Sequence, residues 1–213
     1  MDSRLPSDFV GDSQAAITYR KCILDFSDKD YENKQSAKLA KTFLDRLNNV
    51  LYEIIPKEKD HGQAAKSIKG TAFELLTAEM LQMHEINPLY AQAQMRNVPQ
   101  SQIDFLLYDE HAPIIFTCKM SLRERWRQAA YEGMCLKQVY YNAECYVICA
   151  DEDDVRIRNK NIKNNEINGI NWCYMVDSEE LQELFIDLSN RNFSLAKDIN
   201  PIIGIPKIVR KIE

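Results

Sequence analysis

Hydrophobic residues recur at three- and four-residue steps through the N-terminal third of the chain, a spacing typical of amphipathic helices. One stripe lies within residues 36–55 and a second within residues 66–86. Their apolar positions are Leu39, Phe43, Leu47 and Leu51 in the first, and Phe73, Leu76 and Met80 in the second. Pro56 and the pair Asn87-Pro88 follow these stripes, so a stop signal comes after each predicted helix.

The period changes in the middle of the chain, where short runs rich in Ile, Phe and Leu replace the helical stripes. Residues 102–109 and 113–119 are two such runs, and the turn-like segment between them predicts a β-hairpin. The remaining elements, in chain order, are a helix over 121–141, a buried strand over 143–151, a polar helix or loop over 153–167, a buried strand over 170–177, a helix over 178–192 and an irregular or extended tail over 200–213. This order predicts an α/β fold with a central mixed β-sheet flanked by helices and a helical N-terminal third.

The length of 213 residues suits a single domain, 1–213, in which we expect a mostly helical part over 1–60 and a core over 61–213. The N-terminus lacks the apolar core of a signal peptide, and no apolar run approaches the roughly 20 residues of a membrane span. We therefore expect a cytoplasmic protein. Six scattered cysteines without a CxxC pair predict free thiols in a reducing compartment, and the three distant histidines do not suggest a zinc site.

A net charge of −5 argues against non-specific coating of nucleic acid, but a local basic groove is still possible. Positive charge gathers over residues 119–127 and again over 207–213, whereas acidic residues gather near 151–154 and 177–183. The charged residues of the first cluster are Lys119, Arg123, Arg125 and Arg127, with Glu124 among them.

Four residues near the hairpin are candidates for chemistry. Asp104 lies on the first hairpin strand and Lys119 ends the second, and paired strands lie about 5 Å apart. Such a pair can hold Mg²⁺ and orient a water, although the pair by itself favours a plain ion pair on a hairpin. Glu132 lies 13 residues after Lys119 on the following helix, where it shares a face with Arg125 and Gln128 and could add a second carboxylate. Glu74, on the earlier helix, is a further candidate; the alternatives are a solvated Glu74 and a role for Glu79.

An Asp on a hairpin strand followed by x-x-Lys at the end of the next strand resembles the PD-(D/E)xK nucleases. Ile103 and Thr117 depart from that pattern, because they occupy the places of its proline and its strand acid. One branch of type II restriction endonucleases, related to EcoRII, SsoII and NgoMIV, carries this acid on the next helix, 13 or 14 residues after the lysine. Glu132 matches that position, and Arg123-Glu124-Arg125 matches the basic-acidic-Arg triplet that this branch carries four positions after the lysine. The resemblance is strongest over residues 98–135.

The resemblance implies a role for each candidate residue. Asp104 and Glu132 would hold Mg²⁺, Lys119 would position or activate the attacking water, and Glu74 would support the metal site. The triplet would read a CC·GG step in the major groove. Arginine pairs with guanine O6 and N7, and a carboxylate accepts from cytosine N4. Without the resemblance, the alternative interpretation of residues 123–127 is a solvated basic face. The spacing of Ser121 and Glu124 also predicts a capping box at the start of the helix.

The implied function is that of a type II restriction endonuclease, which cleaves double-stranded DNA with Mg²⁺ at a CC…GG site such as CCGG, CCNGG or CCWGG and leaves 5′-phosphate ends. Cutting both strands implies a homodimer. A DNA methyltransferase of the same specificity would act on the same site without stable contact, in a prokaryotic cytoplasm. Two alternatives remain open: a repair or structure-specific nuclease of the same fold, and a non-catalytic DNA-binding protein, which Thr117 favours.

Overall fold

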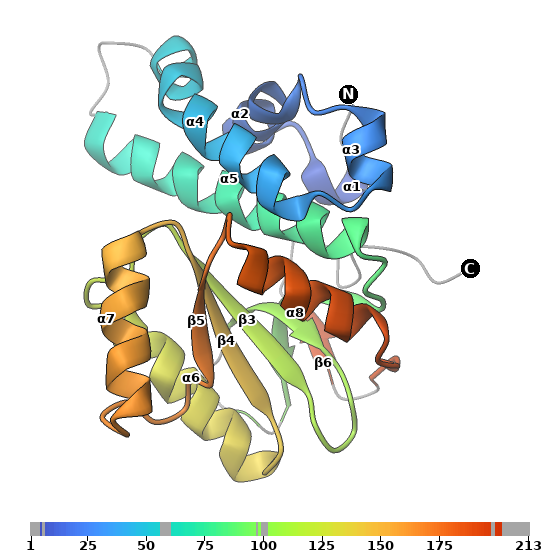
Figure 1. Ribbon diagram of the computed structural model, residues 1–213, viewed down its shortest axis with the longest axis vertical. Coiled ribbons are helices and arrows are strands. Elements are labelled where there is room, and N and C mark those ends of the chain that lie inside the picture. The colour runs from blue at the N-terminus through green and yellow to red at the C-terminus, as the bar shows by residue number, and fades with distance from the viewer. Residues whose placement is uncertain are drawn as a thin grey trace.

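The computed structural model describes residues 5, 7–55, 61–96, 98, 102–196 and 199–201, and it shows a layer of helices above a helix-flanked β-sheet (Figure 1). Within these residues, the N-terminal part is helical up to Met83. Its elements are α1 (Ser7–Val10), α2 (Gln14–Ile23), α3 (Asp28–Glu32), α4 (Ser36–Ile54) and α5 (His61–Met83). The long helix α5 lies between the other helices of this layer and the sheet, and it packs on β3 (Figure 1).

Both predicted apolar stripes are buried, as the helical spacing requires. Leu39, Phe43, Leu47 and Leu51 of α4 are buried, as are Phe73, Leu76 and Met80 of α5. These side chains belong to the largest hydrophobic cluster, which also includes one face of the sheet. The amphipathic pattern therefore fixes which side of α5 faces the core, and it leaves the other side available for polar residues.

The sheet combines an antiparallel half with a parallel half. Its described strands are β1 (Leu89–Met95), β2 (Ile103–Leu107), β3 (Ile114–Lys119), β4 (Glu144–Cys149), β5 (Trp172–Met175) and β6 (Ile199–Pro201), in the spatial order β5-β4-β3-β2-β1-β6. β2 pairs antiparallel with β1 and β3, whereas β3, β4 and β5 run parallel. The mixed sheet and the predicted hairpin are thus confirmed. Continuing the β2–β3 register places Asp104 opposite Thr117.

Three further helices cover the sheet. They are α6 (Trp126–Val139), α7 (Glu152–Lys163) and α8 (Glu179–Ser189). α8 packs its buried residues Leu181 and Phe185 into the same cluster as α4 and α5, and α6 and α7 cover the opposite face of the sheet (Figure 1). The side chains of Ser178 and Asp151 cap α8 and α7, as expected for helix N-termini.

Two glycines bring α6 close to the loop before β5. A Cβ on Gly133 would lie 2.3 Å from the carbonyl oxygen of Gly169, which is a clash that no side chain tolerates. Gly169 itself has a φ of +93°, in the region that favours glycine. This close approach fixes the height of α6 above the sheet, and with it the position of the neighbouring Glu132.

The start of α5 was predicted wrongly and one strand was missed. α5 begins at His61 rather than at residue 66 and ends at Met83, before Asn87-Pro88. The polar segment 153–167, predicted as helix or loop, forms most of α7. β1 was not predicted at all, so the hairpin is part of a three-stranded meander. In the predicted tail, the basic segment 207–213 lies outside the described residues.

All six cysteines are free thiols, and five of them are buried, as the sequence predicted. In the described part of the chain, no helix is both long and apolar enough to cross a membrane.

Candidate active site

Asp104 and Lys119 meet where β2 begins and β3 ends, which confirms the proximity that the hairpin predicts. The Lys119 Nζ donates to Asp104 Oδ2 at 2.9 Å, and the backbone N–H of Cys118 donates to the same oxygen at 2.8 Å. The side chain of Lys119 is only 15% exposed and that of Asp104 only 9%. Burial opposes the charge on Lys119, but the carboxylate of Asp104 outweighs it, and the pKa of Lys119 is raised. Lys119 is therefore a cation at neutral pH.

Glu132 approaches this pair from α6. Its side chain is buried, and Gln128 Nε2, one helical turn earlier, donates to its Oε1 at 2.9 Å. Burial is the main cause that raises the pKa of Glu132, and the charge of Asp104 raises it further, against the opposing effects of the Gln128 hydrogen bond and of Lys119. The charge of Asp104 thus disfavours ionisation of Glu132, as expected for two carboxylates at one site.

Glu74 reaches the same site from α5. Gln92 Nε2 of β1 donates to its Oε2 at 3.0 Å. Burial and then the charge of Asp104 raise the pKa of Glu74 to about 7, although Lys119 and Gln92 oppose the shift. Glu79, the alternative on this helix, instead accepts a hydrogen bond from the Tyr19 hydroxyl of α2 at 2.6 Å. It belongs to the contact between helices.

Gln92 is a site residue that the sequence reasoning missed. The β1–β2 register places it opposite Asp104, and its φ is +50°, a rare conformation for a residue other than glycine. Gln102 Nε2 donates to its Oε1, so its amide is held between Gln102 and Glu74. Strained residues that the surrounding contacts hold in place tend to gather at functional sites.

The Arg-Glu-Arg triplet lies in the turn before α6, not in the first turn of the helix. The predicted capping box was wrong: Arg125 is the N-cap residue and no side chain caps the helix. Glu124 pairs with Arg127 at 2.8 Å instead, with both side chains more than two-thirds exposed. Asp154 of α7 holds the turn, since its Oδ2 accepts from the backbone N–H of Leu122 at 2.7 Å.

A cavity of about 270 Å³ joins this turn to the carboxylate site. Its lining comes from the end of β3, from the turn and from α5, and includes Glu74, Lys119, Arg123 and Arg125. The arginines of the triplet and the candidate catalytic lysine thus border one space. Lys66, Lys69 and Gly70 of α5 complete the wall, and none of them was a candidate from the sequence.

The carboxylates fit a hard divalent cation in chemistry and in charge. Asp104 Oδ2 is already taken by Cys118 and Lys119, which leaves Oδ1 for a metal. Among the described residues, no three His, Cys, Asp or Glu side chains form a ready ligand group. Mg²⁺ commonly binds through one or two carboxylates, with waters and substrate phosphate oxygens as its other ligands, so Asp104 and Glu132 suit it.

Comparison with known proteins adds little beyond this geometry. No protein-family model and no curated protein sequence matches the chain. A similar solved structure is that of metal-depleted Ecl18kI in complex with uncleaved, modified DNA, at 15% identity and a TM-score of 0.49, covering 86% of this chain and 82% of that chain. A likeness of this size carries no argument about activity, so the functional case depends on the side chains.

Proposed function

We propose that this protein is a Mg²⁺-dependent endonuclease that cleaves double-stranded DNA at a CC…GG site, as type II restriction endonucleases do. The observation that carries the proposal is the buried Asp104–Lys119 pair, whose charges act on Glu132 and Glu74 from two other elements. Burial and then the charge of Asp104 raise the pKa of Glu74, and burial with the charge of Asp104 raises that of Glu132. Clusters of buried groups with shifted pKa values are typical of catalytic sites, and two members of this cluster, Glu74 and Lys119, also border the cavity.

In this mechanism, Asp104 and Glu132 would hold Mg²⁺, which would supply Lewis-acid polarisation of the scissile phosphate and help to activate the attacking water. Lys119 donates one hydrogen to Asp104 and has two others that can reach a phosphate oxygen or orient the water. Because Lys119 is a cation, it does not accept the proton of the water; it stabilises the negative charge that develops on the phosphate oxygens. The water oxygen forms a bond to phosphorus while the bond between phosphorus and the 3′ oxygen breaks. The water gives its proton to solvent and the 3′ oxygen takes one from solvent, which leaves a 3′-hydroxyl and a 5′-phosphate.

The turn at residues 123–125 supplies the sequence specificity in this proposal. Arg123 and Arg125 are exposed at the cavity and have no ion-pair partner within the described residues, so their guanidinium groups can each pair with a guanine. Glu124 is exposed as well, and it can accept from cytosine amines once it releases Arg127. A homodimer would present two such turns to the two half-sites of a near-palindrome.

The test is Mg²⁺-dependent cleavage of a long DNA by the wild type and by Asp104→Asn and Glu132→Gln. Both variants keep the shape of the side chain but weaken the metal site, so we expect cleavage to fall by more than about 100-fold, since the loss of an outer-shell partner alone costs about 10–100-fold. Glu110→Gln is the matched control, because this exposed residue lies at the opposite end of the hairpin. Full cleavage by Glu132→Gln would contradict the proposed site.

A DNA-binding protein without catalysis is the second candidate. Thr117 favours it, because this buried residue lies opposite Asp104 where the resembled nucleases carry an acid. Specific binding of a CC…GG duplex without cleavage at any Mg²⁺ concentration would support this candidate over the nuclease.

A further inference from the structure

The cavity beside Lys119 has a wall on α5 that the proposed chemistry does not use. Lys66, Lys69 and Gly70 form this wall, roughly one to two helical turns before Glu74 on the same helix. All three face the space that Arg123 and Arg125 border from the other side. The wall therefore lies next to the place that the proposed function gives to the scissile phosphate.

The lining of this cavity is strongly positive. Its charged side chains are Lys66, Lys69, Lys119, Arg123 and Arg125, against the single carboxylate of Glu74. Lys66 has no ion-pair or hydrogen-bond partner within the described residues. A chain with a net charge of −5 thus concentrates cations in one cavity, which is the electrostatic pattern of a polyanion site.

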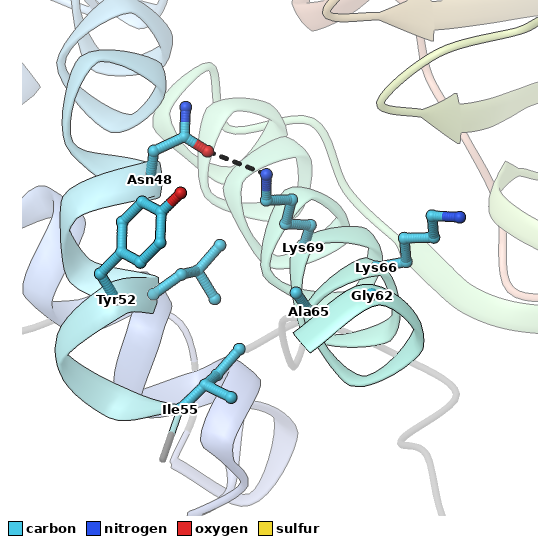
Figure 2. A pocket seen from close by; sticks show the side chains of 8 residues that line it. Asn48, Tyr52, Ile55, Gly62, Ala65, Lys66 and Lys69 are labelled. Atoms are coloured by element: carbon cyan, nitrogen blue, oxygen red, sulfur yellow. Dashed lines mark hydrogen bonds between the residues drawn. The ribbon is translucent and has the colours of Figure 1, made fainter. Parts of the chain in front are cut away.

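Lys69 is held in position by α4. Its Nζ donates to Asn48 Oδ1 at 2.8 Å, and two further hydrogens of the ammonium group remain for a ligand. Figure 2 is drawn on the neighbouring pocket between α4 and α5, which both lysines also line, and it shows Lys69 reaching toward Asn48 while Lys66 extends away from α4. The ammonium group of Lys69 is therefore oriented by a hydrogen bond and that of Lys66 is exposed, and the neutral Asn48 partner leaves the charge of Lys69 uncompensated.

Gly70 has no packing explanation. Glycine inside a helix is destabilising relative to alanine, and a Cβ on Gly70 would meet no atom within 4 Å. Gly133 is the contrasting case, because a Cβ there would clash with the backbone of Gly169. Gly70 lines the cavity, so the absence of a side chain there lets a ligand approach the backbone of α5 closely.

The spacing along α5 suits consecutive phosphates. Lys69 and Lys66 precede Glu74 by five and eight residues, which correspond to roughly 7.5 Å and 12 Å along the helix axis. One DNA strand carries a phosphate about every 3.4 Å of duplex axis, so phosphates near the scissile one fall within this span. Flexible lysines tolerate the remaining difference in direction.

We propose that Lys66, Lys69 and Gly70 form a phosphate-binding wall that holds the backbone of the cleaved strand next to the scissile phosphate. This inference depends on the proposed function for the identity of the ligand, but not on catalysis. The wall contacts no base, so it contributes affinity and register without sequence preference. Asn48 acts as a positioning residue through Lys69.

The experiment measures binding of two duplexes in EDTA over a range of salt concentrations, one with a CCWGG sequence and one with the same bases scrambled. The double variant Lys66→Gln/Lys69→Gln should lower the slope of log K against log salt by about 2 on both duplexes, since each lost phosphate contact removes about 0.9. Lys41→Gln, an exposed lysine of α4 outside the cavity, is the matched control and should leave the slope unchanged.

A second variant keeps the inference testable if the double variant is unstable. Gly70→Ala should weaken binding of both duplexes while its thermal midpoint stays the same or rises. Unchanged slopes in the double variant, or unchanged binding by Gly70→Ala, would overturn the wall.

Cleavage by the wild type with Mg²⁺ separates the two proposals. If the wild type cleaves DNA and the Lys66→Gln/Lys69→Gln variant has an unchanged slope, the proposal of a phosphate-binding wall is rejected and the proposed nuclease function stands. If the slope is reduced in the double variant but the wild type does not cleave, the phosphate-binding wall is supported and the nuclease function is rejected. A wild type that binds neither duplex overturns both.

Discussion

Replacing Glu74 with glutamine should stabilise the protein, and the gain should grow with pH. Glu74 is buried beside Asp104, and its pKa of about 7 means that the fold favours its neutral form. Glutamine has nearly the same shape and is always neutral. Its amide oxygen can still accept the hydrogen bond from Gln92. The substitution thus removes one buried charge without removing the contact.

The size and sign of the effect follow from the two pKa values. The ordinary value for glutamate is 4.5 and the value in the fold is about 7. At about 1.4 kcal/mol per pH unit, full ionisation in the fold costs roughly 3 kcal/mol, and partial solvation of the side chain reduces this to about 2–3 kcal/mol. A raised carboxyl pKa gives stability that is present below pH 4.5 and is lost as the pH rises through 7. The variant should match the wild type near pH 4.5 and exceed it above pH 7.

The assay is denaturant unfolding in EDTA between pH 4.5 and 8.5, with the thermal midpoint as a second readout. For a chain of this size, 2–3 kcal/mol corresponds to a rise of about 4–10 °C. Glu32→Gln, at an exposed position of α3, is the control that reports any general effect of losing a negative charge. A gain that is equal at all pH values, or a Glu74→Gln variant that is less stable than the wild type at pH 8, would refute the reasoning.

Three other substitutions test separate parts of the site. Glu132→Gln should abolish the rise in thermal midpoint that Mg²⁺ gives the wild type, because the second carboxylate of the metal site is lost; an equal rise would place the metal elsewhere. Arg125→Ala should weaken binding of a CC…GG duplex by about 1–3 kcal/mol and that of scrambled DNA much less, as competition binding would measure. Gly133→Ala should lower the free energy of unfolding in urea by about 1–3 kcal/mol, because its Cβ would meet the carbonyl of Gly169. A variant as stable as the wild type would show that α6 can move away from this carbonyl.

The sequence predicted most elements because their apolar periods are local. β1 is the exception. Residues 89–95 alternate weakly, with Ala91, Ala93 and two glutamines where a strand usually has branched residues. Pairing with β2 and β6 makes this segment a strand, and such long-range pairing is not visible in a local window.

The start of α6 was misplaced because a capping pattern competed with a distant contact. Ser121 and Glu124 have the spacing of a capping box, but Asp154 of α7 accepts from the backbone N–H groups of Leu122 and Arg123. Arg123 takes a φ of +35° as a result of this turn. The triplet therefore lies before the helix, where all three of its side chains are exposed.

Hairpin geometry was enough to bring Asp104 and Lys119 together, because antiparallel pairing is a local rule. Gln92 could not be predicted from the sequence, since its part depends on the unpredicted strand β1. Lys66 and Lys69 did carry a signal. Lys66 precedes Gly70 and Glu74 at four-residue steps and Lys69 by three residues, so this side of α5 would have pointed to both lysines.

The most direct test of the central proposal is to map every DNA end that the protein produces. Purified wild-type protein is incubated with Mg²⁺ on a long DNA of known sequence, and the fragment ends are read by sequencing. The proposed function predicts 5′-phosphate ends at one fixed position within every CC…GG site of a single spacing, and none with Asp104→Asn. Ends scattered without sequence preference, or intact DNA at all Mg²⁺ concentrations, would contradict it.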